Sequence, residues 1–235
     1  MAGPPGCGKS SLCYPIWGDK SVGWDSKPPP AYWKPFLDEL TAMMPLVADH
    51  VDPHGRPTIQ AVQRMCDRSI KKMATVERMD ENICAPGSTP EMTWGKIEGR
   101  GVFIQTGLVQ RILGFGWRLH DLGRDINLIR PALWRMPASV GVAFLDAPLE
   151  VITERNLARE KVAATAHENR SHQVPHMLAC IPLVKEVMHA RGVSVVEIDV
   201  AGQSIDEARA QLLAFADRPA CDAAKMGHCH QVAAV

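Results

Sequence analysis

A glycine-rich run near the start of the chain constrains this sequence more than any other feature: residues 3–10 read Gly-Pro-Pro-Gly-Cys-Gly-Lys-Ser. The run fits the pattern G-x-x-x-x-G-K-[S/T], whose backbone N–H groups surround the phosphates of a nucleotide. Glycine at positions 6 and 8 permits positive φ and a close approach of the backbone to a ligand. We therefore predict a phosphate-binding loop made of Gly3, Gly6, Cys7, Gly8, Lys9, Ser10 and Ser11. A Gly-rich turn that happens to precede Lys-Ser is the alternative.

Two side chains of this loop carry the chemistry that it predicts. Lys9 supplies a mobile positive charge for the β- and γ-phosphates, and the Ser10 hydroxyl is placed to reach Mg²⁺. A helix that begins near Lys9 would point its positive end at the same phosphates. The sequence thus predicts ATP and Mg²⁺ as ligands, with Ser10 as the metal-binding residue.

The position of the loop in the chain is unusual. Such loops normally follow a buried β-strand, which fixes their direction, but only Met1 and Ala2 precede Gly3. We expect that the chain as given lacks its leading strand, or else that another part of the molecule holds the loop.

Composition excludes several classes of protein. The chain has 26 basic and 26 acidic residues, which disfavours a general nucleic-acid binder or a membrane-surface protein. Its seven cysteines are scattered, and no signal peptide is recognisable, so they are expected to be reduced thiols in the cytoplasm. No apolar run approaches the ~18 residues that span a bilayer. Oligomeric state is left open.

The pattern of apolar runs predicts an α/β fold. Short runs rich in β-branched residues at Gly101–Gln105, Val140–Asp146 and Val193–Asp199 are typical of buried strands, and a further strand is possible at Ser21–Trp24. Sequence typical of helices separates these runs. Alternating strands and helices predict a parallel sheet that is covered by helices on both faces.

Helices are predicted from apolar spacing and from end signals. Apolar stripes cover Lys34–His50 and a segment that begins at Pro57 and continues to Met79, whose basic residues are read as a solvated face. Further helices are expected at Pro148–Glu160 and at Val174–Arg191. Ser204 and Glu207 predict a capping box for a last helix that runs to about residue 216. Residues 217–235 lack periodicity and are interpreted as a mobile tail, in which His228-Cys229-His230 lacks the spacing of a structural metal site.

Three arginines follow the second predicted strand. Arg155 and Arg159 are four residues apart and so project from one helix face, and Arg170 follows after a polar stretch. Guanidinium groups suit phosphate oxygens, and on a mobile segment they can close over ATP. Surface arginines that pair with Glu154 and Glu160 are the alternative.

The loop, the strand that leads into Leu145-Asp-Ala-Pro and the arginine-bearing helix beyond it resemble the P-loop kinases of small molecules, most closely nucleotide and nucleoside kinases such as adenylate and thymidylate kinases. The resemblance covers about residues 3–13, 101–111 and 138–216. It implies a single domain over residues 1–216, with a helical insertion at 31–90 that binds the acceptor and a lid at 148–172. The arrangement of Arg155, Arg159 and Arg170 matches such a lid.

The resemblance also suggests residues for the acceptor and shows one departure. Asp25 is the candidate base for an acceptor hydroxyl, although it is equally suited to cap a turn. Gln110 and Arg111 resemble contacts to a base or phosphate, but a solvent-facing helix start explains them almost as well. Gln105 stands where related strands often end in an acid that holds Mg²⁺ through water; it can orient water or substrate but supplies no charge.

The sequence therefore predicts a kinase that moves the γ-phosphoryl group of ATP to a small acceptor such as a nucleoside, a nucleotide or a sugar derivative. Lys9, Asp25, Arg155, Arg159 and Arg170 would be catalytic, and Asp25, Gln105, Gln110 and Arg111 would bind substrate. A regulatory ATPase without an acceptor and an inactive remnant that has lost its N-terminal strand are the alternatives.

Overall fold

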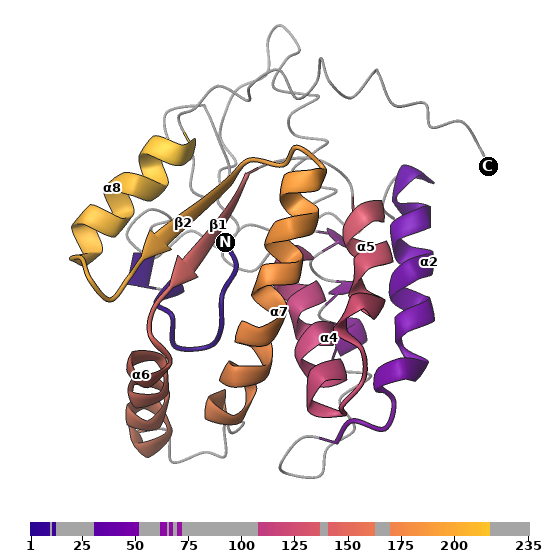
Figure 1. Ribbon diagram of the computed structural model, residues 1–235, viewed down its shortest axis with the longest axis horizontal. Helices are drawn as coiled ribbons and strands as arrows, with labels where there is room; N and C mark the ends of the chain where they lie inside the picture. The colour runs from indigo at the N-terminus through magenta and orange to yellow at the C-terminus, as the bar shows by residue number, and fades with distance from the viewer. Residues whose placement is uncertain are drawn as a thin grey trace, which may run out of the picture.

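The computed structural model is a mixed α/β protein with mostly helices and a two-stranded parallel sheet (Figure 1). It describes residues 1–9, 11–12, 31–51, 62–64, 66–67, 70–71, 108–136, 141–162 and 170–216. In these ranges, no helix has both the length and the apolar character that a membrane span requires.

The sheet consists of β1 (Val142–Asp146) and β2 (Val195–Asp199), paired in parallel so that Val142 lies opposite Val195. Ala2 adds a single parallel bridge to β1: its N–H donates to Ala143 O at 2.8 Å, and its carbonyl accepts the Leu145 N–H at 3.0 Å. The Val142 N–H instead donates to Ser194 O, just before β2. Because N–H groups of alternating residues point to opposite edges of a strand, β1 lies between Ala2 and β2.

The two faces of β1 enter different hydrophobic clusters, as the two-residue period of a strand requires. Ala143 and Leu145 pack with Ala208 and Leu212 of α8 (Ile205–Ala216) and with Cys7 and Leu12 of the N-terminal segment. Val142 and Phe144 join the larger helical core on the opposite face. The alternation explains why this short sheet needs a helical layer on each side.

The helical core lies on the side of the sheet that faces α7 (Arg170–Ala190). In Figure 1, α4 (Leu108–Asp121) lies beside α7, and α5 (Arg130–Arg135) and α2 (Lys34–Met43) follow farther from the sheet. The largest fully buried side chains of this core include Trp33, Phe36, Phe115, Phe144 and Leu133. Each side chain of this size contributes ~1.5–3 kcal/mol by leaving water, so this layer provides much of the stability.

Short elements connect the helices. Three 3₁₀ turns lie at η1 (Ala31–Trp33), η2 (Pro45–Val47) and η3 (Ile126–Ile129), and α6 (Leu149–Val162) follows β1. The capping box predicted for α8 is confirmed: Ser204 Oγ accepts the Glu207 N–H at 3.2 Å, and Glu207 Oε2 accepts the Ser204 N–H at 2.8 Å. Gly192, with φ of 69°, ends the turn after α7.

The predicted strands at 140–146 and 193–199 are confirmed, each two residues shorter at its start, and so are the three C-terminal helices. The predicted helix over 34–50 is wrong in extent: α2 ends at Met43, because Pro45 has no N–H to continue the helical ladder. In the segment predicted to be helical from Pro57, Val62, Cys66 and Ile70 are helical and buried. The predicted strands at 21–24 and 101–105 and the tail at 217–235 lie outside the described residues.

Candidate functional site

The run of glycines forms a loop, here called the glycine loop (residues 3–8), between the bridge at Ala2 and a helical turn. Gly6 and Gly8 have φ of 86° and 92°, in the region that favours glycine. Helical structure begins at Lys9, and the Leu12 N–H donates to Gly8 O at 3.2 Å. The loop thus leaves the sheet at the carboxyl end of the bridging residue, the edge at which open α/β proteins bind ligands.

Side chains from two helices hold the backbone of the loop. Gln110 of α4 accepts the Gly3 N–H through Oε1 at 2.9 Å. Asn156 of α6, which is 1% exposed, donates from Nδ2 to Pro5 O at 3.0 Å. A Cβ on Gly6 would lie 2.8 Å from Asn156 Oδ1 and 2.9 Å from Ile152 O. Only glycine fits where the loop passes α6.

Lys9 returns its ammonium group to the loop that precedes it. Its Nζ donates to Gly3 O at 2.6 Å and to Pro4 O at 2.9 Å, and it lies 3.3 Å from Cys7 Sγ. Such bonds to carbonyl oxygens are readily exchanged for bonds to anionic oxygens, which are stronger partners of an ammonium group. The arrangement therefore places a cation within reach of any anion that the loop binds.

A cavity of about 180 Å³ opens beside the loop, next to the segment that follows β2. Arg155 of α6 lies at this cavity and donates from Nη2 to Val200 O at 3.1 Å. Gln203 also lines it; its Oε1 accepts from Gln211 at 2.7 Å, while its buried Nε2 has no partner among the described residues. The full lining consists of Gly6, Gly8, Ser11, Leu12, Arg155, Val200, Gln203, Ser204, Ile205 and Ala208.

Four of the predicted site residues meet at this cavity: Gly6, Gly8, Ser11 and Arg155. Lys9 and Gly3 are joined by a hydrogen bond, and Cys7 is fully buried in the loop. Gln110 contacts the loop backbone, and the partly exposed Arg111 follows it on α4.

The remaining predicted residues are not placed. Ser10, Asp25 and Gln105 lie outside the described residues. Arg159 lies in α6, and Arg170 is the first residue of α7, but their side chains are outside the described part of the structure. Their predicted roles remain predictions.

Sequence reasoning missed Asn156 and Gln203. Asn156 sits next to Arg155 in a polar helix, where nothing in the local pattern distinguishes a buried amide from an exposed one. Gln203 lies in the short turn before α8, whose Ser204 is recognised only as a cap. Both amides matter because of their place in the fold: Asn156 lies against the glycine loop, and Gln203 lines the cavity.

A second polar cluster, here called the histidine cluster (His50, His120, Asp121, His172 and His176), lies at the other end of α4 from Gln110. Asp121 Oδ2 is 2.7 Å from His50 Nε2, and Asp121 Oδ1 is 2.9 Å from His172 Nε2. Burial lowers the pKa of His50 and of His176, against the opposing effect of Asp121. Burial alone would raise the pKa of Asp121, but its hydrogen bond with His50 and its contacts with His172 and His176 outweigh this and hold it below the ordinary value.

Comparisons with known proteins give no match: no protein-family model, no curated protein and no solved structure is significantly similar to this chain.

Proposed function

We propose that the protein binds ATP at the glycine loop and transfers its γ-phosphoryl group to a small acceptor, as a kinase of the P-loop type. The observation that carries the proposal is the conjunction of the loop, Lys9 and the cavity at the carboxyl ends of the parallel strands. That edge is where α/β folds place ligands. A turn that merely preceded Lys-Ser would need neither the cavity nor two helices to hold it.

The glycine loop supplies the phosphate site of the proposal. Gly8 has positive φ, and a Cβ at this position would meet no atom of the described residues within 4 Å, so on this side the backbone is open for a ligand to approach. The loop is preorganised by Gln110 and Asn156, which lowers the entropic cost of binding. Lys9 would exchange the carbonyls of Gly3 and Pro4 for β- and γ-phosphate oxygens.

The cavity suits one part of the nucleotide. At about 180 Å³ it is smaller than the ~300–1,000 Å³ pockets that enclose drug-sized ligands, and so it would take the base while the phosphates lie over the loop. The buried Nε2 of Gln203 offers an unused hydrogen-bond donor to a ring nitrogen or carbonyl. Arg155 presents a planar guanidinium at the same cavity, which can stack on an aromatic ring.

Phosphoryl transfer needs positive charge near the transferred group and a positioned acceptor. Arg159 lies one helical turn beyond Arg155, and Arg170 opens the next helix, so the sequence order suits a group of cations near the phosphates. Ser10 would hold Mg²⁺, which when bound neutralises charge on the β- and γ-oxygens. Asp25 is the proposed base for the acceptor hydroxyl, and Gln105 and Arg111 are proposed to bind the substrate.

Replacement of Lys9 tests nucleotide binding. Titration calorimetry with ATP and Mg²⁺ should show about 10- to 150-fold weaker binding by Lys9→Ala than by the unmodified protein, the loss of one charge-assisted hydrogen bond. Lys34→Ala is the matched control, because Lys34 is an exposed lysine of α2 that pairs only with Asp38 among the described residues. Equal ATP affinity in the Lys9→Ala protein would refute the proposal.

A second measurement separates transfer from simple hydrolysis. ADP release should depend on an added metabolite when the protein is presented with a library of nucleosides, nucleotides and sugar derivatives. ADP release at the same rate without any acceptor would show a regulatory ATPase instead. The same assay on Lys9→Ala identifies activity that belongs to this loop.

A further inference from the structure

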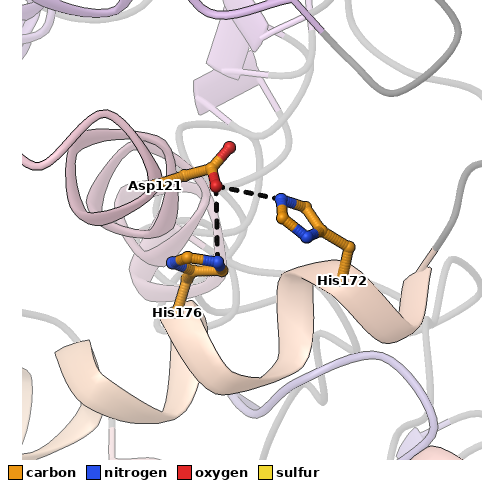
Figure 2. A group of neighbouring side chains, drawn as sticks. All are labelled: Asp121, His172 and His176. Atoms are coloured by element: carbon orange, nitrogen blue, oxygen red, sulfur yellow. Dashed lines mark hydrogen bonds and ion pairs between the residues drawn. The ribbon is translucent and has the colours of Figure 1, made fainter.

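The histidine cluster brings three side chains with metal-binding atoms to one point. Figure 2 shows Asp121, His172 and His176 directed toward one another. Asp121 Oδ1 lies 2.9 Å from His172 Nε2 and 3.3 Å from His176 Nε2, and the ligand atoms all lie within 4.8 Å of one another. No residue of this group belongs to the glycine loop or its cavity.

Two helices fix this arrangement. His172 and His176 are four residues apart in the first turns of α7, so their side chains project from the same helix face. Asp121 is the last residue of α4, which packs along α7. Both histidines present Nε2 to one carboxylate oxygen, so three ligand atoms converge from two rigid elements rather than from loops.

The spacing of these atoms is close to what a tetrahedral ion requires. With bonds of ~2.0–2.1 Å to nitrogen and oxygen, ligand atoms around Zn²⁺ stand ~3.3 Å apart. Asp121 Oδ1 lies 2.9 Å from His172 Nε2 and 3.3 Å from His176 Nε2. Side-chain shifts of a few tenths of an ångström would bring these two distances to the tetrahedral value. Two imidazoles and one carboxylate suit zinc and its neighbours and do not suit Mg²⁺ or Ca²⁺, which prefer oxygen.

Two of the three residues, Asp121 and His176, also have outer partners in place. His50, which is 2% exposed, holds the second carboxylate oxygen of Asp121 at 2.7 Å. His120 Nδ1 lies 2.8 Å from His176 Nδ1, so one of these nitrogens donates to the other. If His176 donates, its Nε2 is left with a lone pair directed at Asp121. Metal-binding histidines and carboxylates characteristically have such supporting bonds.

We propose that Asp121, His172 and His176 bind a divalent transition metal, Zn²⁺ in the first instance, which joins the end of α4 to the beginning of α7. His50 and His120 orient the ligands from outside. The 40% exposure of the His172 side chain leaves the remaining coordination position open to water. This proposal does not depend on nucleotide binding by the glycine loop.

Zinc binding to the full-length, chelator-treated protein tests the site. Competition with a chromogenic chelator should give one tight equivalent of Zn²⁺, and Co²⁺ should give the visible absorption of a tetrahedral site. Asp121→Asn and His176→Ala should each weaken Zn²⁺ binding by at least about 100-fold, since loss of an outer partner alone typically weakens binding ~10- to 100-fold. His120→Ala, which removes only an outer partner, should weaken it by about tenfold.

Two controls make the result decisive. His189→Ala removes an exposed histidine from the last turn of the same helix and should leave zinc affinity unchanged. A variant with His228, Cys229 and His230 all replaced by alanine should also keep the tight equivalent, because the ion is held by α4 and α7. Circular dichroism confirms that each variant is folded. Zinc affinity that is unchanged in folded Asp121→Asn and in His120→Ala, or that is lost with the C-terminal residues, would overturn the proposal.

Discussion

The glycine loop and the histidine cluster are both polar sites that helix α4 supports, yet they are built differently. The loop is one contiguous run of sequence whose backbone is held by single side chains from α4 and α6. The cluster draws on residues from three separate parts of the chain, around positions 50, 121 and 172–176, and joins side chain to side chain. A site that consists of one backbone segment can be recognised from adjacent residues in the sequence. A site that consists of side chains on separate helices can be recognised only once the fold has brought them together.

The largest expected effect is a loss of stability that differs between two glycines of the loop. Gly6→Ala should destabilise the protein by about 2–5 kcal/mol, because φ of 86° strains any other residue and the new Cβ would meet Ile152 O and Asn156. Gly8→Ala shares the strained φ, but its new Cβ meets no atom within 4 Å in the described part of the chain, so we expect a loss of only about 1–2 kcal/mol. Urea unfolding of both variants measures the difference. Equal losses would show that α6 does not confine the loop.

A matched pair of glycines tests the helical side in the same way. A Cβ on Gly116 of α4 would lie 3.0 Å from Cys180 Sγ and 3.2 Å from Ile129 Cδ1, both in fully buried residues. Gly116→Ala should therefore cost about 1–2 kcal/mol, since overpacking exceeds the gain in helix propensity. Among the described residues, the new Cβ of Gly114→Ala meets only the end of Arg118, at 3.8 Å, so this change should stabilise the helix by about 0.5–1 kcal/mol. Thermal unfolding shows whether each variant is more or less stable than the unmodified protein. A stabilising Gly116→Ala would contradict the close contact between α4 and α7.

The smallest effect concerns the residue of α4 that reaches the loop. If Gln110 acts by accepting the Gly3 N–H, Gln110→Ala should weaken ATP binding about fivefold, the value of one hydrogen bond of ~1 kcal/mol. Gln110→Glu keeps an acceptor oxygen and should stay within about twofold of the unmodified protein at high ionic strength, where salt screens the repulsion between the new carboxylate and the phosphates. Calorimetric titration with ATP distinguishes them. A glutamate variant that is weaker than the alanine variant would instead favour direct contact with phosphate.

Local signals in the sequence predicted much of the fold. β1 and β2 are short β-branched runs, and α8 begins at a capping box that its residues spell out. The bounds of α4 and α5 were not predicted, although helical sequence was expected between the strands at 101–105 and 140–146. Helix α4 contains Gly114 and Gly116, which lower helix propensity, and its packing against α7 shows why they are tolerated. The end of α2 was misplaced because the apolar stripe continues past Pro45.

Only some residues of the candidate site could likewise be predicted from the sequence. The loop and Arg155 were predicted from the sequence, and the structure places Arg155 at the cavity beside the loop. Gln203 and Asn156 were not predicted. A side-chain amide points to a binding site only when burial leaves it with few hydrogen-bond partners, and burial is not visible in the sequence. The residues of the histidine cluster were not predicted either, because His50, Asp121 and His172 lie far apart in the chain and no sequence spacing relates them.

Helix α4 connects the two sites directly. Gln110 in its first turn and Asp121 at its end are separated by ~16 Å of continuous helix at 1.5 Å per residue. If the glycine loop and Asp121 bind the ligands proposed for them, an ion that drew Asp121 toward α7 would also displace the anchor of Gly3, because both residues belong to one short helix. The two binding equilibria would then be interdependent, with each ligand altering the affinity for the other by the same factor.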